Sequence, residues 1–378
     1  MIKREIESQI KEHLNSGKTI IIYGARQVGK TTLLHQLFDK SKNVLWLNGD
    51  IAKDRASLDD LTLESARLLI GDAKTVIIDE AQRIEDIGLK LKILHDGFGK
   101  KVQFIATGSS SFELANKINE PMTGRKWTFR LSPLSVNELI SANGLLSESS
   151  SLEARLRYGS YPDVVTNPTR AAEIVTDLAN DNLYKDVLNL TDIIKTDRLS
   201  KILKALAFQI GSQVSMNELA ELVGLDNKTI DKYISLLEQA FIVFRLPSFG
   251  RNLRNELKSS TKIYFYDVGI RNALIEDFRP LDSRQDIGSL FENYIIAEFQ
   301  KKNPHHAYFW RTSQQQEVDY LTEYDGNLSA AEIKWSEKKS AKLPSTFTSA
   351  YRPKNQYSIN RENYLSLFAD HQFDFLQN

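Results

Sequence analysis

Short apolar runs alternate with helical patterns along the first third of the chain. Thr19–Tyr23 is a β-branched, apolar run typical of a buried strand, and Thr31–Phe38 then places leucines at helical spacing. Further strand-like runs are Val44–Leu47, Thr75–Ile78 and Val102–Thr107. Because strands and helices alternate, this region predicts a parallel α/β sheet.

The middle of the chain has a different pattern. A serine-rich segment, 141–151, could form a boundary, and residues 152–194 are mostly helical in pattern. Leu199–Ile210 and two shorter amphipathic helices then precede the strand-like runs Phe241–Leu246 and Ile263–Tyr266. A helix, a helix–turn–helix and a two-stranded ribbon in this order are the winged-helix pattern.

Composition restricts the class of protein. The chain has 378 residues, enough for two or three domains, and it has 49 basic and 49 acidic residues. Because the net charge is zero, a nucleic-acid surface would have to be local. No apolar run approaches the roughly 18 residues of a membrane span. The absence of cysteine excludes disulfides and thiolate sites, and we expect a cytoplasmic protein without a membrane partner.

A phosphate-binding motif follows the first predicted strand. Gly24, four further residues and then Gly29-Lys30-Thr31 match G-x-x-x-x-G-K-[ST], and a helix pattern begins at Thr31. Backbone N–H groups and the helix dipole would face one anionic pocket, and Lys30 would reach the β- and γ-phosphates. The predicted ATP-binding residues are Gly24, Ala25, Arg26, Gln27, Val28, Gly29, Lys30, Thr31 and Thr32.

The third strand-like run ends in two acidic residues. After a phosphate loop, Asp79 would hold Mg²⁺ beside the Thr31 hydroxyl, and Glu80 would orient the attacking water. The alternative is a polar strand end at a turn. No motif that reads a guanine base is evident, so ATP is the expected nucleotide.

Two further positions are candidates for sensing or completing hydrolysis. Thr107, with Ser109 as its competitor, ends the next strand and could sense the γ-phosphate; the alternative is a Ser/Gly turn. Arg125, with Arg130 as its competitor, could act as an arginine finger on a neighbouring subunit, which allows a homo-oligomer. The alternative is a solvated surface arginine.

These residues resemble a large prokaryotic group of AAA-type ATPases. The resemblance is carried by the loop 24–33 and by Ile78-Asp79-Glu80-Ala81-Gln82, Thr107-Gly108-Ser109-Ser110, Gly124-Arg125, Leu131-Ser132-Pro133-Leu134-Ser135 and Gly159-Ser160-Tyr161-Pro162. It implies an α/β fold with a P-loop AAA-type core over 1–141, a helical lid over 142–195, a winged helix over 196–270 and a restriction-endonuclease-like domain over 271–378.

The C-terminal region resembles the PD-(D/E)xK core of restriction-enzyme-like nucleases. Asp319 lies on one predicted strand, and Glu332 and Lys334 point to one face of the next by the period-two rule. Two carboxylates could hold a second divalent metal, with Glu292 from the preceding helix completing the site, and Lys334 could stabilise charge or assist a water. The alternative is a degenerate domain that binds a partner without cutting.

DNA is the expected partner of the winged helix, with an interdomain connector as the alternative. The second helix offers Lys228 and Lys232 for phosphate contact. The ribbon offers Arg251, Arg254, Lys258 and Lys262. The leading hypothesis is therefore a Mg²⁺-dependent ATPase that couples ATP turnover to DNA binding or processing. Its alternative is a nucleotide-dependent switch or scaffold with an inactive C-terminal domain.

Overall fold

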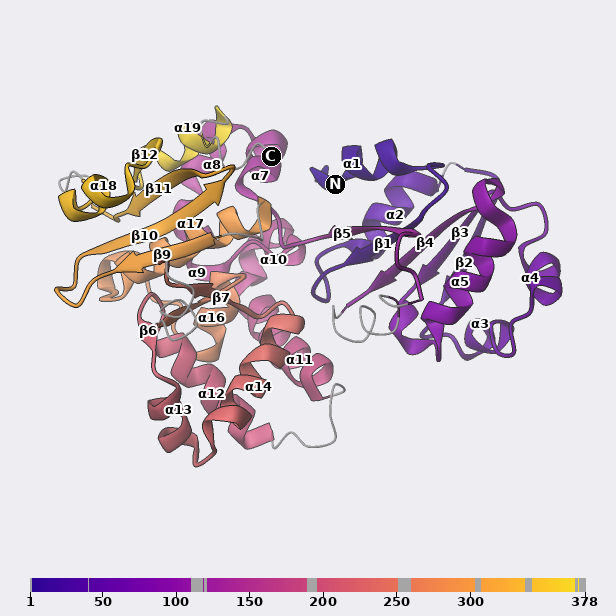
Figure 1. The fold of residues 1–378 in the computed structure, drawn as a ribbon, viewed down its shortest axis with the longest axis horizontal. Helices are drawn as coiled ribbons and strands as arrows, with labels where there is room; N and C mark the ends of the chain where they lie inside the picture. The colour runs from indigo at the N-terminus through magenta and orange to yellow at the C-terminus, as the bar shows by residue number, and fades with distance from the viewer. Residues whose placement is uncertain are drawn as a thin grey trace. The chain divides into compact units, whose positions relative to one another are not determined.

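The computed structural model describes residues 2–39, 41–109, 118, 121–188, 196–250, 260–302, 307–336, 342–370 and 373. The chain divides into two compact units (Figure 1). The first consists mainly of residues 1–133, and the second consists mainly of the chain from Leu134 onward. The predicted boundary segment 141–151 is largely helical, and the predicted four-domain division stays a prediction.

The first unit is built on a five-stranded sheet. Its strands are β1 (Thr19–Tyr23), β2 (Val44–Asn48), β3 (Thr75–Asp79), β4 (Gln103–Gly108) and β5 (Lys126–Arg130), in the order β2-β3-β4-β1-β5. All neighbours pair in parallel, which confirms the predicted α/β class. Since β4 lies between β1 and β3, the ends of these three strands meet at one edge, where α/β sheets bind ligands.

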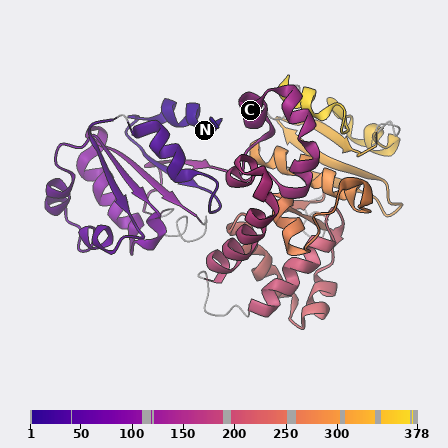
Figure 2. The same cartoon turned by 180° about the vertical axis from the view of Figure 1, so that it is seen from behind.

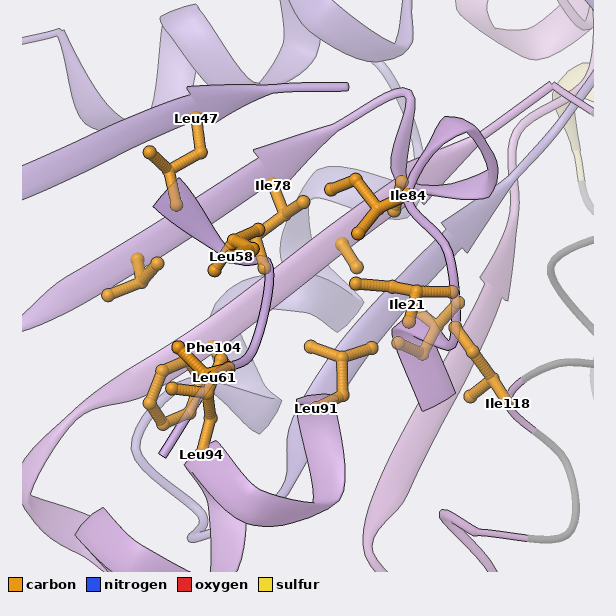
Figure 3. Close-up of a cluster of buried hydrophobic side chains, with 14 of the residues drawn as sticks. Ile21, Leu47, Leu58, Leu61, Ile78, Ile84, Leu91, Leu94, Phe104 and Ile118 are labelled. Carbon is orange, nitrogen blue, oxygen red and sulfur yellow. The ribbon is translucent and has the colours of Figure 1, made fainter. Parts of the chain in front are cut away.

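Helices cover both faces of this sheet (Figures 1 and 2). They are α1 (Ile6–His13), α2 (Lys30–Phe38), α3 (Ala52–Ser57), α4 (Leu63–Ile70) and α5 (Ile87–Phe98), with short 3-10 helices at Ala81–Arg83 and Gly99–Lys101. Figure 3 shows the core on one face, where Ile21, Ile78 and Phe104 from the strands meet Leu91 and Leu94 of α5. Successive strand residues point to opposite faces, so this core fixes which side of each strand is buried here.

The second unit begins with helices. They are α7 (Val136–Asn143), α8 (Leu145–Ser150), α9 (Leu152–Tyr158), α10 (Pro162–Thr166) and α11 (Ala171–Leu188), with a 3-10 helix at Pro168–Arg170. The predicted helical character of 152–194 is confirmed for its described residues. Ser135 caps α7 by accepting a bond from the Glu138 N–H, and the Glu138 carboxylate accepts from the Ser135 N–H in return.

Three helices and a small sheet follow. The helices are α12 (Thr196–Phe208), α13 (Met216–Val223) and α14 (Asn227–Gln239), and the strands β6 (Gln213–Val214), β7 (Val243–Pro247) and β8 (Thr261–Phe265) form an antiparallel sheet in the order β6-β8-β7. Ser215 caps α13 and Asp226 accepts from the Thr229 N–H at the start of α14. The predicted order of helices and strands is therefore confirmed.

The last part of the second unit is a four-stranded sheet with helices. Its strands are β9 (Ala307–Arg311), β10 (Glu317–Tyr324), β11 (Asn327–Ile333) and β12 (Asn355–Ile359), and its helices are α16 (Val268–Leu274), α17 (Ile287–Lys302), α18 (Ser345–Tyr351) and α19 (Tyr364–Ala369), with a 3-10 helix at Leu281–Ser283. β9, β10 and β11 are antiparallel neighbours, whereas β12 pairs with β11 in parallel.

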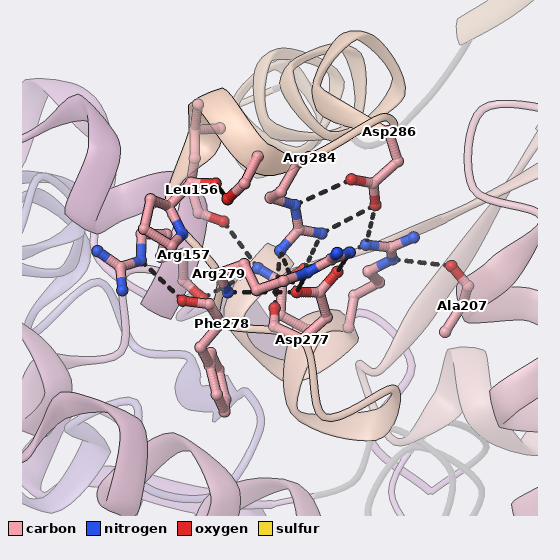
Figure 4. A network of polar contacts seen from close by, with 12 residues as sticks. Leu156, Arg157, Ala207, Asp277, Phe278, Arg279, Arg284 and Asp286 are labelled. Carbon is pink, nitrogen blue, oxygen red and sulfur yellow. Dashed lines mark hydrogen bonds and ion pairs between the residues drawn. The ribbon is translucent and has the colours of Figure 1, made fainter.

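A polar network connects helices of the second unit (Figure 4). Arg284 donates to both carboxylate oxygens of Asp286, and Arg271 donates to one of them. Arg271 also donates to the Ala207 carbonyl at 2.8 Å, which connects α16 to α12. Both arginines are buried, and each has charge-assisted partners, so the network stabilises a fixed arrangement of these helices. No helix among the described residues is long and apolar enough to cross a membrane.

Candidate functional site

The phosphate-binding loop connects β1 to α2. Gly29 has a φ of 96°, in the left-handed region that favours glycine, and Gln27 has a φ of 60°. A Cβ atom on Gly24 would lie 2.1 Å from the Leu131 carbonyl oxygen, so only glycine fits there. These two glycines allow the backbone to turn tightly from the strand into the helix. The free N–H groups at the start of α2 therefore face the loop.

Lys30 lies within this loop and is 5% exposed. Its Nζ donates to the carbonyl oxygens of Gly24 and Ala25, at 2.8 Å each. Both acceptors are neutral, so these two bonds leave the ammonium with its positive charge. Of the other predicted binding residues, Val28 is buried, Arg26 is half-buried, and Gln27 and Thr32 are exposed.

A residue that the sequence did not indicate supports the loop from outside. Arg4 is 6% exposed, and its guanidinium donates to the Val28 carbonyl and to the Ser132 carbonyl, at 2.6 Å each. It thereby connects the loop to the segment after β5. An isolated arginine before the first helix has no sequence signal for this role, because the contact joins residues 128 positions apart.

The ends of β3 and β4 meet the start of α2 through Asp79. Thr31 Oγ1 donates to Asp79 Oδ2 at 2.7 Å, and Thr107 Oγ1 donates to Asp79 Oδ1. The Glu80 N–H lies 3.2 Å from both Asp79 Oδ1 and Thr107 Oγ1. The structure therefore brings together four of the predicted site residues, and it places Thr107 against the carboxylate of Asp79.

Glu80 is held by a second residue that the sequence analysis did not select. The side-chain amide of Gln82 donates to Glu80 Oε2 at 2.5 Å and to Ser109 Oγ at 3.2 Å. Glu80 itself has a φ of 49°. Ser109 therefore contacts the site through Gln82. The Glu-Ala-Gln order was visible in the sequence, but only the turn at Glu80 brings the two side chains together.

The candidate arginines are not joined to this constellation by any contact described for the first unit. Arg125 forms an ion pair with Asp96, with 2.8 Å between Nε and Oδ1, and its side chain is 37% exposed. Arg130 ends β5 and is half-buried. Which of the two acts as a finger stays a prediction.

A second polar cluster lies in the second unit, around β10, β11 and α17. Lys334 Nζ lies 2.6 Å from Glu332 Oε1 and 3.2 Å from Asp319 Oδ2, and the Ile333 N–H donates to the same Asp319 oxygen at 2.7 Å. Glu292 of α17 accepts bonds from the Tyr264 hydroxyl at 2.6 Å and from Lys262 at 3.0 Å. The pair formed by Lys334 with Asp319 and Glu332 is as the sequence predicted.

The location of Lys262 corrects one sequence prediction. Lys262 was assigned to a basic ribbon that contacts phosphates, but its side chain is 1% exposed and forms ion pairs with Glu292 and Glu317. The prediction was wrong for this residue because β8 is buried in its unit. Arg251, Arg254 and Lys258, assigned to the same ribbon, lie outside the described residues.

Electrostatics within this cluster favour proton binding by two of its acids. Burial raises the pKa of Glu292 to about 7, and the nearby Asp319 charge adds to the effect while Lys262 opposes it. Burial and the Asp319 charge likewise raise the pKa of Glu332 to about 7. One oxygen of Glu332, Oε2, is buried without a hydrogen-bond partner.

The predicted second metal site is not formed by these residues in this arrangement. Within the described part of the chain, no three or more aspartate, glutamate, histidine or cysteine side chains are arranged to hold a metal ion. The unpartnered oxygen of Glu332 would suit a cation, but the oxygens of Asp319 and Glu292 described above contact ammonium, hydroxyl or backbone donors. The cluster does not therefore fit a metal-dependent nuclease centre.

Three family models match consecutive segments of the chain. An AAA domain matches residues 16–140, a domain of unknown function (DUF8612) matches residues 149–281, and a second domain of unknown function (DUF4143) matches residues 287–374. The protein therefore carries an AAA-type P-loop ATPase domain, followed by C-terminal domains of these two families. The predicted resemblance to AAA-type ATPases is confirmed.

Relatives with a similar sequence occur in bacteria and archaea. A Mycobacterium tuberculosis protein is 27% identical over 336 residues, which cover 88% of this chain and 74% of the relative. A Haemophilus influenzae protein is 26% identical over 278 residues, covering 68% of each chain, and a Methanocaldococcus jannaschii protein is 23% identical over 346 residues, covering 85% and 75%. All three are described as uncharacterized and add no function.

Solved structures with partial similarity include two nucleotide-related proteins. A signal transduction ATPase with a tetratricopeptide repeat sensor from Pyrococcus horikoshii has a TM-score of 0.31 and 13% identity, covering 79% of this chain and 45% of that one. Drosophila ORC bound to AT-rich DNA and Cdc6 has a TM-score of 0.27 and 12% identity, covering 72% and 90%. These scores are too low to support an argument. The chain also spans less than half of the first structure.

Proposed function

We propose that the protein is a Mg²⁺-dependent ATPase whose hydrolysis site is the Asp79 cluster of the first unit. The observation that carries this proposal is the 2.7 Å contact between Thr31 Oγ1 and Asp79 Oδ2. It joins the hydroxyl of the phosphate loop to the acid at the end of β3, which is the pair that P-loop NTPases use.

These oxygens fit a magnesium ion. A hydroxyl and a carboxylate are hard oxygen ligands, and Mg²⁺ in such sites takes only one or two protein ligands besides phosphate and water. When bound with ATP, the ion supplies charge neutralisation at the β- and γ-phosphate oxygens. Thr107 holds Asp79 in place through its own hydroxyl bond, so we assign it a positioning role.

The loop and Lys30 bind the phosphates. The backbone N–H groups at the start of α2 are donors without helical partners, and they suit phosphate oxygens. Lys30 Nζ exchanges its carbonyl acceptors at Gly24 and Ala25 for β- and γ-phosphate oxygens. Arg4 holds the Val28 carbonyl and thereby fixes the loop in its binding shape.

Glu80 orients the attacking water and accepts its proton. Its carboxylate is one residue beyond Asp79, and Gln82 holds one of its oxygens at 2.5 Å, which leaves the other carboxylate oxygen as the proton acceptor. An arginine finger, Arg125 or Arg130, would stabilise transition-state charge from a second copy of the chain.

The load of this ATPase is proposed to be DNA. Support comes from the helices α12, α13 and α14 with the β6-β8-β7 sheet, whose order matches a winged helix, and from Lys228 and Lys232, which are exposed on α14. Such cations contact phosphates without reading bases. Metal-dependent DNA cleavage is not part of the proposal, because the carboxylates of the second unit do not fit a metal.

The second candidate function is a nucleotide-dependent switch whose second unit binds a protein partner. It is favoured by the pairing of cations near α14. Arg245 forms ion pairs with Asp231 and Glu238, and Lys262 is buried with acids, which reduces the basic charge available to DNA.

Steady-state ATP hydrolysis with and without single-stranded, duplex and branched DNA tests both candidates. We expect Mg²⁺-dependent turnover that DNA increases, and a loss of this increase at high salt because phosphate contacts are screened. Turnover that no DNA changes, together with nucleotide-dependent binding of a protein partner, would contradict the DNA proposal and support the switch. No turnover with any nucleotide would contradict both the hydrolysis site and its coupling.

A further inference from the structure

Lys262 is a lysine in an environment that lysine rarely occupies. Its side chain is 1% exposed on β8, and its Nζ lies 3.0 Å from Glu292 Oε1 of α17. The same ammonium forms an ion pair with Glu317 at the start of β10. Because buried lysines need charged partners, these two carboxylates account for its burial.

The surroundings keep this ammonium charged. Burial alone lowers the pKa of Lys262, but the charges of Glu292, Glu317 and Asp319 raise it further, so the pKa lies above its usual range. The positive charge is therefore permanent at neutral pH. It lies among carboxylates from α17 and β10, where a hydrolytic metal centre would place a divalent cation.

We infer that the Lys262 ammonium takes the place of a divalent cation between the carboxylates of α17 and β10, so that the wild-type protein binds no metal ion there. An ammonium satisfies several acceptors with its three N–H donors, whereas a divalent cation needs oxygens that converge on one point. The described chain contains no such convergent group of three acids.

This arrangement has a consequence for a variant without the ammonium. Removing it leaves Glu292 and Glu317 buried with uncompensated negative charge, close to Asp319. The same oxygens are the ligands that hard divalent cations prefer. Substitution of Lys262 by an uncharged residue is therefore expected to create a metal site that the wild-type protein lacks.

The inference goes beyond the proposed ATPase and can fail independently of it. ATP turnover depends on the Asp79 cluster in the first unit, and the residues around Lys262 all belong to the second unit. The experiment below uses nucleotide-free protein and measures metal binding and thermal stability, so it does not depend on ATP turnover.

The test uses the full chain and Mn²⁺ as the probe. Calorimetric titration and thermal unfolding are compared for the wild type, Lys262→Met and the control Lys204→Met, which removes an exposed lysine of α12. We expect K262M to bind one Mn²⁺ more than the wild type. We also expect Mn²⁺ to raise its unfolding midpoint by roughly 5 °C more than that of the wild type, because a ligand specific for the folded state stabilises it.

Two further variants keep the test decisive. Adding Glu292→Gln to K262M should remove the extra Mn²⁺ site, since Glu292 would be one of its ligands. If K262M does not fold, Lys262→Gln replaces it, because Gln keeps a hydrogen-bond donor without the charge, and the same gain is expected. The inference is overturned if the wild type binds Mn²⁺ in a way that Glu332→Gln removes, or if loss of the Lys262 charge creates no additional site.

Discussion

Lys30 and Lys262 are both buried lysines, but they have opposite kinds of partner. Lys30 donates to the neutral carbonyls of Gly24 and Ala25, whereas Lys262 is paired with the carboxylates of Glu292 and Glu317. An ammonium held by neutral acceptors can attract an anionic ligand, while one held by carboxylates has its charge neutralised. The P-loop lysine is therefore suited to binding phosphate, and Lys262 to stabilising its unit.

The largest expected effects come from replacing these two lysines by methionine. Lys262→Met should lower the free energy of unfolding by about 3–5 kcal/mol, because it leaves two buried carboxylates without their cation. Lys30→Met should instead weaken ATP binding by about 100-fold, because it removes a charged hydrogen-bond donor from the phosphates.

Denaturant unfolding and nucleotide titration of both variants check this comparison. We expect K262M to keep its nucleotide affinity and K30M to keep most of its unfolding free energy. The reverse pattern, with K262M losing nucleotide affinity and K30M losing stability, would contradict the roles assigned to the two lysines.

Thr107 tests how the P-loop site positions Asp79. Thr107→Ala removes a hydroxyl that donates to Asp79 Oδ1, and we expect kcat to fall by about 10-fold, the value of one hydrogen bond to a charged group. Thr107→Ser keeps the hydroxyl and should recover most of the turnover. Equal loss in both variants would mean that the methyl packing of Thr107, not its hydroxyl, matters.

Arg4 tests whether the loop depends on support from outside the motif. Arg4→Met should weaken ATP binding by about 5-fold, because the loop carbonyl at Val28 loses a charged donor. Lys3→Met is the matched control, since Lys3 is the exposed cation next to it. Equal affinities of the two variants for ATP would exclude this role of Arg4.

The arginine–aspartate network of Figure 4 is the reference for a polar cluster with a structural role, and it gives the smallest effect. The Arg279 side-chain bond lowers the pKa of Asp277 from 3.8 to about 2. The folded state therefore binds this proton less readily than the unfolded state. Its stabilisation is present above pH 4 and is lost as the pH falls toward 2.

Unfolding measured between pH 5 and pH 2 checks this prediction against Asp277→Asn. We expect the difference in stability between the wild type and this variant to decrease as the pH falls through that window. A difference that stays constant from pH 5 to pH 2 would show that the Asp277 charge does not contribute.

The sequence predicted the parts of the fold and of the site that depend on local patterns. The strand–loop–helix order around Lys30 and the acids after β3 were evident because a motif and a strand end lie close together in the chain. The partnership of Thr31 with Asp79 followed from the known geometry of such motifs. Each strand of the parallel sheet was visible as a short apolar run.

The features that the sequence did not predict depend on contacts between distant segments. Arg4 contacts Ser132, and Lys262 contacts Glu292 across 30 positions, and neither contact has a periodic or motif signal. Lys262 looked like a surface cation because lysine is usually exposed. Gln82 was part of a recognised motif, but its contact with Glu80 depends on the left-handed turn at that residue.

The most direct test of the central claim is single-turnover and steady-state ATP hydrolysis by the wild type, Glu80→Gln and Glu85→Gln. Glu85 is the matched control, because it is an exposed glutamate of the same unit. The account predicts that E80Q binds ATP as the wild type does but hydrolyses it about 1,000-fold more slowly, while E85Q hydrolyses it normally. Hydrolysis by E80Q at the wild-type rate would contradict the assignment of the hydrolysis site.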